Sequence, residues 1–492
     1  MNIALIFYII GRVLQIEAVF LLPSVITALC YGEWQWWVYL ATAAGAALLG
    51  QLVCLRKPRN MSFFMRDGFA AVALSWVVMS AVGAIPLVLG GDIPSYTNAL
   101  FETISGFTTT GASILPDVEA LSHAGLFWRS LTHWIGGMGV LVFLLAILPM
   151  AGGSHMQLMR AESPGPAVGK LVPKVRSTAK ILYLIYIAMT VLEIILLLCG
   201  GMSLFESLTV SFGTAGTGGF AVKNSSIGSY SPYLQWVITI FMALFGVNFS
   251  VYFLLLMRKF RQVCACEELR WYGLILLGAT GLITWNLIRT GAAAGMSFEE
   301  TLRHSAFQVS SIMTTTGFAT IDFDLWPKLS RCVMVILMFI GACAGSTGGG
   351  LKVSRVVILF KSMANELRSY VHPRSVRTLK FEGKPIRDEL TRSIAVYFFI
   401  FILIFTASML ILCRDGKDLV TNFTAVAATI NNIGPGLAAV GPTQNYNAYG
   451  LLSKYVLMFD MLAGRLELYP MLLLFYPAMW RERGFRGKAV KK

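Results

Sequence analysis

Charged residues are scarce in this sequence. Of its 492 residues, 13% are Asp, Glu, Lys or Arg and 56% are hydrophobic, whereas about 25% of the residues in soluble proteins are charged. This composition excludes an ordinary soluble enzyme and predicts a protein embedded in a lipid bilayer. Acidic residues are rarer than basic ones: the sequence has 25 Asp and Glu against 40 Lys and Arg, which gives a formal net charge of +15. The basic residues fall in short clusters between apolar runs, which favours the positive-inside bias of membrane proteins over a nucleic-acid partner.

Histidine and cysteine are also few, at 5 and 8 residues. No histidine pairs with carboxylates or cysteines at the spacing of metal ligands. The cysteines lie mostly within or beside apolar runs, and we interpret them as unpaired packing residues. The sequence shows no nucleophile with its base and no cluster of acids and histidines, so it does not indicate an enzyme.

Apolar runs of the length that a bilayer requires, about 20 residues, recur along the chain. They cover residues 3–29, 36–55, 68–89, 125–149, 181–198, 234–257, 271–288, an interrupted 332–360, 394–412 and 451–480. After the first two, the runs form pairs, and a stretch too polar to span and too apolar for a free loop, such as 98–107, separates the members of each pair. We interpret each such stretch as a half-membrane helix followed by an extended segment.

This pattern predicts an all-α integral membrane protein with two leading helices and four helix–pore loop–helix repeats in a pseudo-fourfold arrangement around a central pore. The predicted boundaries are residues 1–60 for the leading unit and 61–155, 156–262, 263–365 and 366–492 for the four repeats, the third with an intramembrane loop and the fourth with a cytoplasmic tail.

Four polar strips follow the half-membrane stretches. Strip 1 is residues 108–111 (Thr-Thr-Thr-Gly), strip 2 is 216–219 (Gly-Thr-Gly-Gly), strip 3 is 314–317 (Thr-Thr-Thr-Gly) and strip 4 is 431–434 (Asn-Asn-Ile-Gly). Their last glycines recur at intervals of 108 (219−111), 98 (317−219) and 117 (434−317) residues, which indicates four copies of one module. Three glycines compete for the register of strip 2, and the match of Gly219-Phe220-Ala221 to Gly317-Phe318-Ala319 favours Gly219.

The strips have the composition of a monovalent-cation site. Backbone without helical partners is tolerated at membrane depth only where protein encloses it or water reaches it, so the strips are expected to surround a wet axis. Backbone carbonyls can replace the hydration shell of a cation, and glycine permits the angles that turn them toward the axis. The strips contain no Asp or Glu, which argues against calcium or magnesium. The predicted passenger is potassium, with sodium as a second passenger, and the filter is expected to be shorter and less uniform than that of potassium channels.

The predicted selectivity filter comprises the strips and the residues that follow them: Thr109, Thr110, Gly111, Ala112, Gly218, Gly219, Phe220, Thr315, Thr316, Gly317, Phe318, Asn432, Ile433, Gly434 and Pro435. The K⁺ ions are expected on a subset: Thr110, Gly111, Gly218, Gly219, Thr316, Gly317, Ile433 and Gly434.

A glycine-rich segment, residues 341–352, interrupts the eighth apolar run. So many glycines favour unwinding of the helix, and the unwound segment is predicted to form a movable gate beneath the filter. The gate residues are Gly345, Ser346, Thr347, Gly348, Gly349, Gly350 and Lys352. Close helix packing at small residues is the alternative interpretation, and Lys352 can instead extend to the cytoplasmic surface. A phosphate-binding loop is disfavoured because the Gly-Lys-Ser/Thr ending is absent.

Arg465 is the second predicted gate, midway along the last apolar run. A charge at the centre of a membrane helix costs about 2.5 to 3.5 kcal/mol, so Arg465 should face the protein interior or water. In the ion pathway it would repel cations. It could equally pair with Glu467 or Asp460 as a static clamp.

The charges also predict orientation. The basic clusters at 56–66, 160–180, 258–261, 368–387 and 481–492 fall on one side, which identifies the cytoplasm and places both termini there. On the opposite side, acidic residues are expected to form an outer vestibule that concentrates cations: Asp92, Asp117, Glu119, Asp322 and Asp324. Within the apolar runs and half-membrane stretches, Glu102, His133 and Glu193 are interpreted as structural residues.

The strips, the Asn-Asn-Ile-Gly-Pro-Gly variant at 431–436, the two leading helices and the run Ala-Gly-Arg-Leu-Glu-Leu-Tyr-Pro at 463–470 resemble the TrkH/TrkG-type membrane subunits of bacterial Trk potassium uptake systems, within the Trk/Ktr/HKT superfamily. The resemblance implies a multi-pass protein of the bacterial inner membrane that forms a homodimer with one pore per subunit. It also implies a cytoplasmic TrkA-type regulator, with nucleotide bound on that partner and no organic cofactor on this chain. The basic segment 361–387 and the basic tail are candidate docking surfaces, or carry positive-inside charge alone.

The expected function is therefore potassium uptake across the bacterial inner membrane through a carbonyl-lined filter. The intramembrane loop and Arg465 would gate it under the control of the regulator. The alternative is a sodium- or proton-coupled potassium symporter. Flux measurements separate the two, because a pore follows the potassium gradient without an obligatory partner ion.

Overall fold

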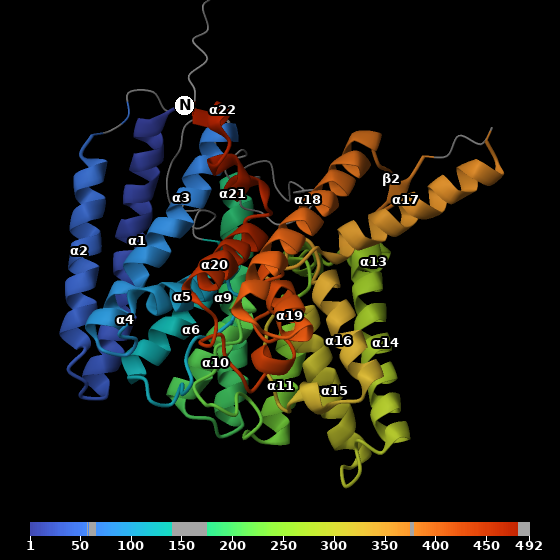
Figure 1. Cartoon of the computed structure of the whole chain (residues 1–492), viewed down its shortest axis with the longest axis horizontal. Coiled ribbons are helices and arrows are strands. Elements are labelled where there is room, and N and C mark those ends of the chain that lie inside the picture. The colour runs from blue at the N-terminus through green and yellow to red at the C-terminus, as the bar shows by residue number, and fades with distance from the viewer. Residues whose placement is uncertain (57, 59–64, 140–174, 374–377, 481–492) are drawn as a thin grey trace, which may run out of the picture.

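The structure is a computed structural model that describes residues 1–56, 58, 65–139, 175–373 and 378–480. Two long helices, α1 (Ile3–Cys30) and α2 (Trp36–Cys54), pack against each other at one edge of the molecule (Figure 1). α1 also packs on α3 (Met65–Gly83) and α6 (His123–Met138) of the first repeat, which attaches the leading pair to the rest.

Four times the chain then passes from a long helix through a short half-helix to a second helix. The first repeat contains α3 (Met65–Gly83), α4 (Ile85–Leu89), the half-helix α5 (Tyr96–Phe107) and α6 (His123–Met138). The second contains α9 (Val175–Cys199), the half-helix α10 (Leu204–Gly216), α11 (Pro232–Phe245), α12 (Phe249–Leu256) and α13 (Phe260–Ala265).

The third repeat contains α14 (Glu267–Thr290), the half-helix α15 (Phe298–Met313), η1 (Phe323–Leu325), α16 (Lys328–Ile340) and α17 (Val353–Val371). A small antiparallel hairpin follows, β1 (Lys380–Phe381) with β2 (Lys384–Pro385), in which Lys380 pairs with Pro385. The fourth contains α18 (Asp388–Leu412), η2 (Cys413–Asp415), the half-helix α19 (Leu419–Ile430), η3 (Ala438–Val440), α20 (Leu451–Arg465), α21 (Tyr469–Leu474) and α22 (Pro477–Trp480).

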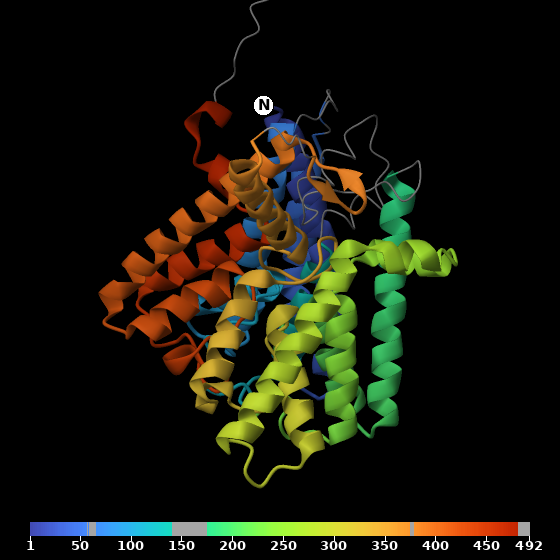
Figure 2. The same ribbon diagram turned by 90° about the vertical axis from the view of Figure 1, so that its right-hand side faces the viewer.

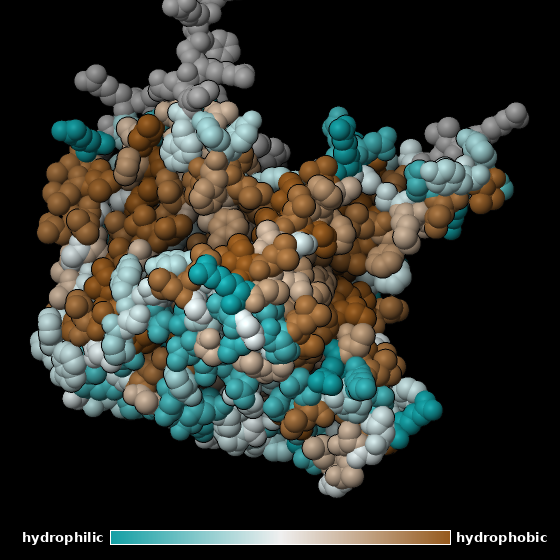
Figure 3. Space-filling model, in the orientation of Figure 1, coloured by the Kyte–Doolittle hydropathy of each residue, from teal (hydrophilic) through white to brown (hydrophobic). Residues whose placement is uncertain are grey.

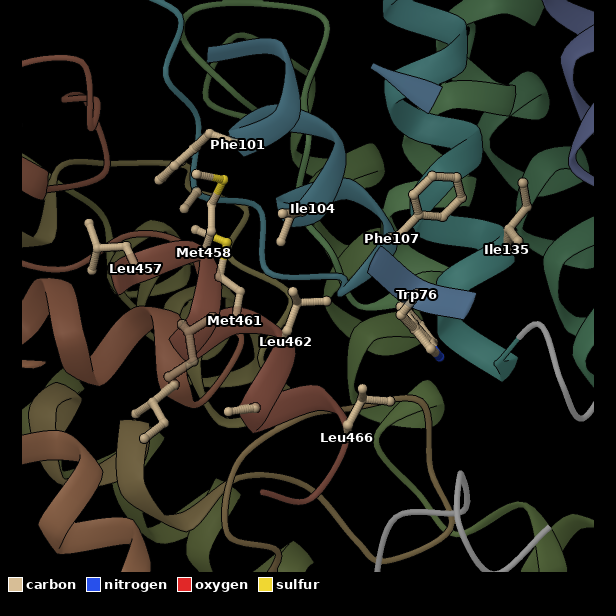
Figure 4. Packing of buried hydrophobic residues seen from close by; sticks show 14 of the residues in the cluster. Trp76, Phe101, Ile104, Phe107, Ile135, Leu457, Met458, Met461, Leu462 and Leu466 are labelled. Carbon is tan, nitrogen blue, oxygen red and sulfur yellow. The ribbon is translucent and has the colours of Figure 1, made fainter. Parts of the chain in front are cut away.

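The half-helices determine how the repeats are arranged. Each packs against the second helix of the repeat before it: α10 on α6, α15 on α11 and α19 on α16. α5 packs on α20, which joins the first repeat to the fourth. Figure 4 shows this last contact, where Phe101 and Ile104 of α5 lie beside Met458, Met461 and Leu462 of α20. The four repeats therefore close into a cycle.

Six helices in the described part of the chain are long and apolar enough to cross a membrane, or seven if the bent pair α11 and α12 is one span. Many large hydrophobic side chains on these helices are exposed, among them Leu184, Leu277 and Phe399. Figure 3 shows hydrophobic atoms over much of the upper part of one face and hydrophilic atoms gathered toward its lower part. An exposed apolar surface of this extent suits contact with lipid, so the chain is a multi-pass membrane protein.

The sequence predicted continuous spans at 234–257 and 451–480, but the structure breaks both, so that prediction was wrong. The run 234–257 is bent by 93° between α11 and α12, so that α12 runs sideways in Figure 2. Asn248 causes the second helix to begin anew, because its side chain accepts a hydrogen bond from the Ser250 N–H as an N-cap.

The run 451–480 is interrupted after Arg465, where Glu467 and Leu468 have positive φ angles of 62° and 61°. Arg465 therefore ends a helix and does not lie midway along one. The run 332–360 leaves residues 341–352 outside helices, as its glycines predict. α6 ends at Met138, and residues 140–149 of the run 125–149 lie outside the described residues.

Candidate functional site

All four half-helices direct their C-terminal ends into the polar strips. Three of them begin after Ser95, Ser203 or Ser297 and the fourth after Asp418, residue types that favour helix N-termini. Their C-caps are the strip residues Thr108, Thr217, Thr314 and Asn431. The C-terminal end of a helix carries a partial negative charge. Four such ends converging on the strips favour a cation there.

The strips share one backbone conformation. The second and fourth residues of each have positive φ: Thr109 (54°) and Gly111 (75°), Thr217 (55°) and Gly219 (77°), Thr315 (61°) and Gly317 (86°), Asn432 (56°) and Gly434 (96°). A left-handed conformation costs a non-glycine residue about 1–2 kcal/mol, and β-branched threonine adopts it rarely. Strain repeated at four matched positions indicates a functional constraint. The pattern also places Gly219, and not Gly216 or Gly218, in register with the other three glycines.

The strip amides face their own half-helices. At the third position, the N–H groups of Thr110, Gly218, Thr316 and Ile433 donate to helix carbonyls five residues earlier, at 2.8, 2.8, 2.8 and 2.7 Å. The N–H groups at the second position donate three residues back. Since N–H and C=O point in opposite directions in a trans peptide group, the carbonyls of the first two positions are directed away from the helix. Within the described residues, no donor reaches the carbonyl oxygens at positions two and three of any strip.

These strips lie in a closed cycle. A Cβ atom added to the fourth-position glycine of one strip would approach the third-position carbonyl oxygen of the next: Gly111 to Gly218 at 2.0 Å, Gly219 to Thr316 at 2.0 Å, Gly317 to Ile433 at 2.2 Å and Gly434 back to Thr110 at 2.7 Å. A pocket of about 140 Å³ adjoins the cycle and is lined by all four of these glycines. The predicted ion-site residues are therefore brought together around one opening.

The predicted filter residues that follow the glycines lie behind this cycle or beside it. Ala112, Phe220 and Phe318 are buried. The ring of Phe220 lies 4.2 Å from that of His133, and Phe318 packs against Gly213 of α10. The two phenylalanines thus support strips 2 and 3 from the preceding repeat. Pro435, Ala112 and Phe220 also line the pocket.

His133 connects two repeats. Its Nδ1 lies 2.8 Å from the Gly106 carbonyl oxygen of α5, and its Nε2 accepts a hydrogen bond from the Phe220 N–H at 3.3 Å. Both nitrogens have partners when the imidazole is neutral with the proton on Nδ1. His133 is therefore a hydrogen-bonded packing residue, as predicted, and it fixes strip 2 to the first half-helix.

Glu102 and Arg129 form a buried ion pair behind strip 1. Arg129 donates from Nε and Nη2 to Glu102 Oε1 at 2.8 and 2.6 Å. The same carboxylate accepts from Ser113 Oγ at 3.0 Å and from the Ile114 N–H at 2.9 Å, just beyond the strip. The structural interpretation of Glu102 is confirmed. Sequence reasoning missed Arg129, although a lone arginine in an apolar run signals a buried partner.

Replacing Glu102 with Gln is expected to lower the free energy of unfolding by about 3–5 kcal/mol, because it leaves Arg129 buried without a counter-charge. Thermal unfolding in detergent measures the loss. Asp324→Asn is the matched control, since Asp324 pairs with Arg331 at 3.3 Å in a partly exposed position, where an ion pair contributes about 0–1 kcal/mol. Equal shifts for both variants would contradict the buried-pair argument.

The acidic vestibule stays a prediction: Asp117, Glu119 and Asp322 accept hydrogen bonds from pocket-lining residues but do not line the pocket themselves. The pocket beside the glycines is lined by Arg129 and Lys223 and by no Asp or Glu among the described residues. Asp92 instead accepts hydrogen bonds from Ser122 at the start of α6. Asp117 accepts one from Asn224 at 2.7 Å, which lowers the pKa of its carboxyl. These acids satisfy donors in the loops.

The intramembrane loop, residues 341–352, lies against the opposite end of strips 3 and 4. The Gly349 N–H donates to Thr315 Oγ1 at 2.6 Å, and a Cβ on Gly349 would lie 2.5 Å from the Asn431 carbonyl oxygen. On its other side, the loop fills the break between α11 and α12, where Cys343 N–H donates to Gly246 O and Phe249 N–H to Gly345 O, both at 3.0 Å. The loop and the pocket thus occupy opposite ends of the strips.

Lys352 ends the loop and folds back into it. Its side chain is 1% exposed, and Nζ donates to the Gly348 carbonyl oxygen. The alternative in which Lys352 extends to the cytoplasmic surface is therefore wrong. Burial follows because this bond closes the loop on itself and supplies a partner for the ammonium group.

Arg465 connects the loop to the first repeat. Its guanidinium donates from Nη1 to Thr347 O at 2.8 Å and from Nη2 to the carbonyl oxygens of Gly136 and Gly137, the second at 2.8 Å. The predicted clamp partners are engaged elsewhere: Glu467 accepts from Arg355 and Asp460 from Ser408. Arg465 therefore binds main-chain oxygens of two repeats, and the clamp with Glu467 or Asp460 is wrong.

The chain is similar to known membrane transport proteins in both sequence and fold. Residues 39–482 match the TrkH family model, described as a cation transport protein. The chain is 39% identical over 422 residues to the Trk system potassium uptake protein TrkH of Escherichia coli K12, covering 85% of this chain and 86% of that protein. It is 33% identical over 487 residues to TrkH of Halomonas elongata, covering 98% and 100%. The crystal structure of the potassium transporter TrkH from Vibrio parahaemolyticus superposes with a TM-score of 0.87 at 31% identity, covering 98% of this chain and 100% of that one.

Proposed function

This chain belongs to the TrkH family of cation transport proteins, and from that premise we propose how it transports potassium. As a member of the Trk family it is a potassium uptake transporter and not an enzyme. In our proposal the four strips form the selectivity filter. Dehydrated K⁺ binds the carbonyl oxygens of Thr110, Gly111, Gly218, Gly219, Thr316, Gly317, Ile433 and Gly434. Four boundaries, after residues 60, 155, 262 and 365, separate a leading unit from four pseudo-fourfold repeats.

One observation carries this proposal: the third-position carbonyl oxygens of the four strips lie in a cycle and have no protein donor in the described chain. At the fourth position, the Gly434 carbonyl oxygen also accepts a hydrogen bond from Tyr446 Oη at 2.7 Å. A buried carbonyl without a partner costs free energy, and a cation that replaces the missing donor recovers it. Neutral oxygens bind a monovalent ion weakly enough to release it. The four half-helix ends add a negative potential without a fixed carboxylate.

The intramembrane loop and Arg465 form the gate in this proposal. Gly345, Ser346, Thr347, Gly348, Gly349, Gly350 and Lys352 would block the inner end of the filter, and Arg465 would add a positive charge below it. Support comes from the contacts of Gly349 with strip 3 and of Arg465 with Thr347. Opening requires both sets of contacts to be released.

We further propose that the protein is a homodimer in the bacterial inner membrane, with both termini in the cytoplasm, and that a TrkA-type nucleotide-binding subunit controls the gate. The exposed basic residues Arg368, Lys384 and Arg387 support a cytoplasmic docking surface. Positive-inside charge alone accounts for them equally well.

Growth rescue and flux test the proposal. Expression in bacteria that lack their own potassium uptake should restore growth at limiting potassium. Purified protein in liposomes should take up ⁸⁶Rb⁺ along a potassium gradient, with Na⁺ as a weaker competitor. Uptake that requires a sodium or proton gradient would favour the symporter, and an absence of K⁺-dependent uptake in correctly inserted protein would contradict the filter.

A further inference from the structure

One carboxylate oxygen ties both ends of the intramembrane loop. Glu268 lies in the first turn of α14 and is 5% exposed. Its Oε1 accepts the N–H of Ala344, near the start of the loop, at 2.7 Å and the N–H of Ser354, just beyond its end, at 3.1 Å. The two amides are 10 residues apart (354−344) but share a single acceptor. The carboxylate therefore draws the ends of the loop together.

The two amides and the N-terminal turn of α14 stabilise the negative charge of the Glu268 carboxylate. No Lys, Arg or His of the described residues forms an ion pair with it. Hydrogen bonds to an ionised acceptor are roughly twice as strong as neutral ones, and the N-terminal turn of a helix stabilises a negative charge. Removal of this carboxylate thus acts directly on the loop, without freeing a cation elsewhere.

The same turn of α14 contacts the cytoplasmic hairpin. The backbone N–H of Glu268 donates to Oε1 of Glu382, between β1 and β2, at 3.0 Å. Cys266 Sγ lies 3.4 Å from the same oxygen. Next to it, Glu267 forms an ion pair with Lys361 of α17, and Lys361 donates to the Lys380 carbonyl at 3.0 Å. Residues 266–268 therefore contact the hairpin on one side and the loop on the other.

We propose that Glu268 is a positioning residue that holds the intramembrane loop in the blocking position, and that the hairpin at 380–385 sets that position through Glu382. The inference rests on the proposed function, because it treats the loop as the gate. Displacement of the hairpin removes the Glu382 oxygen from the first turn of α14. The turn then shifts, and the loop loses its shared acceptor.

Substitution of Glu268 with Ala is expected to raise K⁺ flux in liposomes by about tenfold without any partner protein, within the range typical of coupling between sites. The preference for K⁺ over Na⁺ should not change, since the strips are untouched. Glu389→Ala is the matched control, because Glu389 is an exposed glutamate in the first turn of α18. Flux equal to that of the wild type overturns the proposal, as does a gain shared by the control.

The hairpin part of the proposal is tested by a double-mutant cycle. Glu382→Ala alone should raise flux, and it should add nothing in the Glu268→Ala background, because the hairpin acts on the loop through the Glu268 carboxylate, which that background already lacks. Independent, additive gains would show that the hairpin does not act through Glu268.

Cys343 provides a readout that does not depend on conduction. It lies in the loop next to Ala344 and is 1% exposed. A water-soluble maleimide, with the modified peptide quantified by mass spectrometry, should label Cys343 faster in Glu268→Ala and at an intermediate rate in Glu268→Gln, which keeps one oxygen acceptor. Equal labelling in all three proteins overturns the proposal. If neither the wild type nor an Arg465→Ala variant conducts K⁺, the filter proposal fails, and the labelling still decides the role of Glu268.

Discussion

Alanine at Gly111 or Gly219 is expected to abolish potassium transport, whereas alanine at Gly434 should leave part of it. The new Cβ would lie 2.0 Å from the carbonyl oxygen of Gly218 or Thr316 in the first two variants and 2.7 Å from that of Thr110 in the third. All three positions have positive φ, which costs alanine about 1–2 kcal/mol. The additional clash displaces the neighbouring strip, so the damage should rank as Gly111 and Gly219 first, then Gly317, then Gly434.

Uptake of ⁸⁶Rb⁺ into liposomes, with competition by K⁺ and Na⁺, measures both the rate and the ion preference. Gly278→Ala is the control, because Gly278 lies in α14 and a Cβ there has nothing within 4 Å. Normal transport and unchanged ion preference in all four strip variants would show that the cycle of carbonyls is not the filter.

Alanine at Arg465 is expected to increase basal K⁺ flux by tenfold or more. The substitution removes a positive charge and the bonds to Thr347, Gly136 and Gly137. Two unit charges 4 Å apart interact by about 4 kcal/mol at an effective dielectric constant of 20, and about 1.4 kcal/mol in a barrier changes a rate tenfold. Both losses act in the same direction, toward an open pathway.

Arg465→Lys separates the two losses, because lysine keeps the charge but cannot hold three carbonyls in a planar fork. Flux that stays low in the lysine variant assigns the barrier to charge, and flux that rises as in the alanine variant assigns it to the bonds. Arg414→Ala, at an exposed position in η2, controls for the loss of an arginine elsewhere. Basal flux at or below the wild-type level in inserted Arg465→Ala protein would remove the gate assignment.

The features that repeat along the chain could be predicted from the sequence. The half-helices and strips recur at nearly constant intervals, and the apolar runs are long enough to cross a bilayer. The glycines of 341–352 predicted an unwound loop, because glycine disfavours a helix more strongly than any residue except proline. Strip 2 required a choice among three glycines, and its positive φ at Gly219 agrees with the choice made.

Features that depend on tertiary contacts could not be predicted. The bend at residues 246–248 has only Gly246 and Asn248 to signal it, and the segment around them is apolar enough to span. The break after Arg465 uses positive φ at Glu467 and Leu468, residues whose own preferences do not favour it. The ion-pair partners of charged side chains could not be predicted either, because Arg129 pairs with Glu102 and Arg355 with Glu467 only in the folded chain.

The four strips that meet in the cycle belong to a single polypeptide. In a symmetric homotetramer every codon change is copied into all four subunits. A substitution in such a pore therefore alters all four quadrants at once. Here each quadrant can be altered by itself. Variants carrying one, two, three or four changes would therefore form a graded series from one gene, and each quadrant is free to diverge in sequence from the other three.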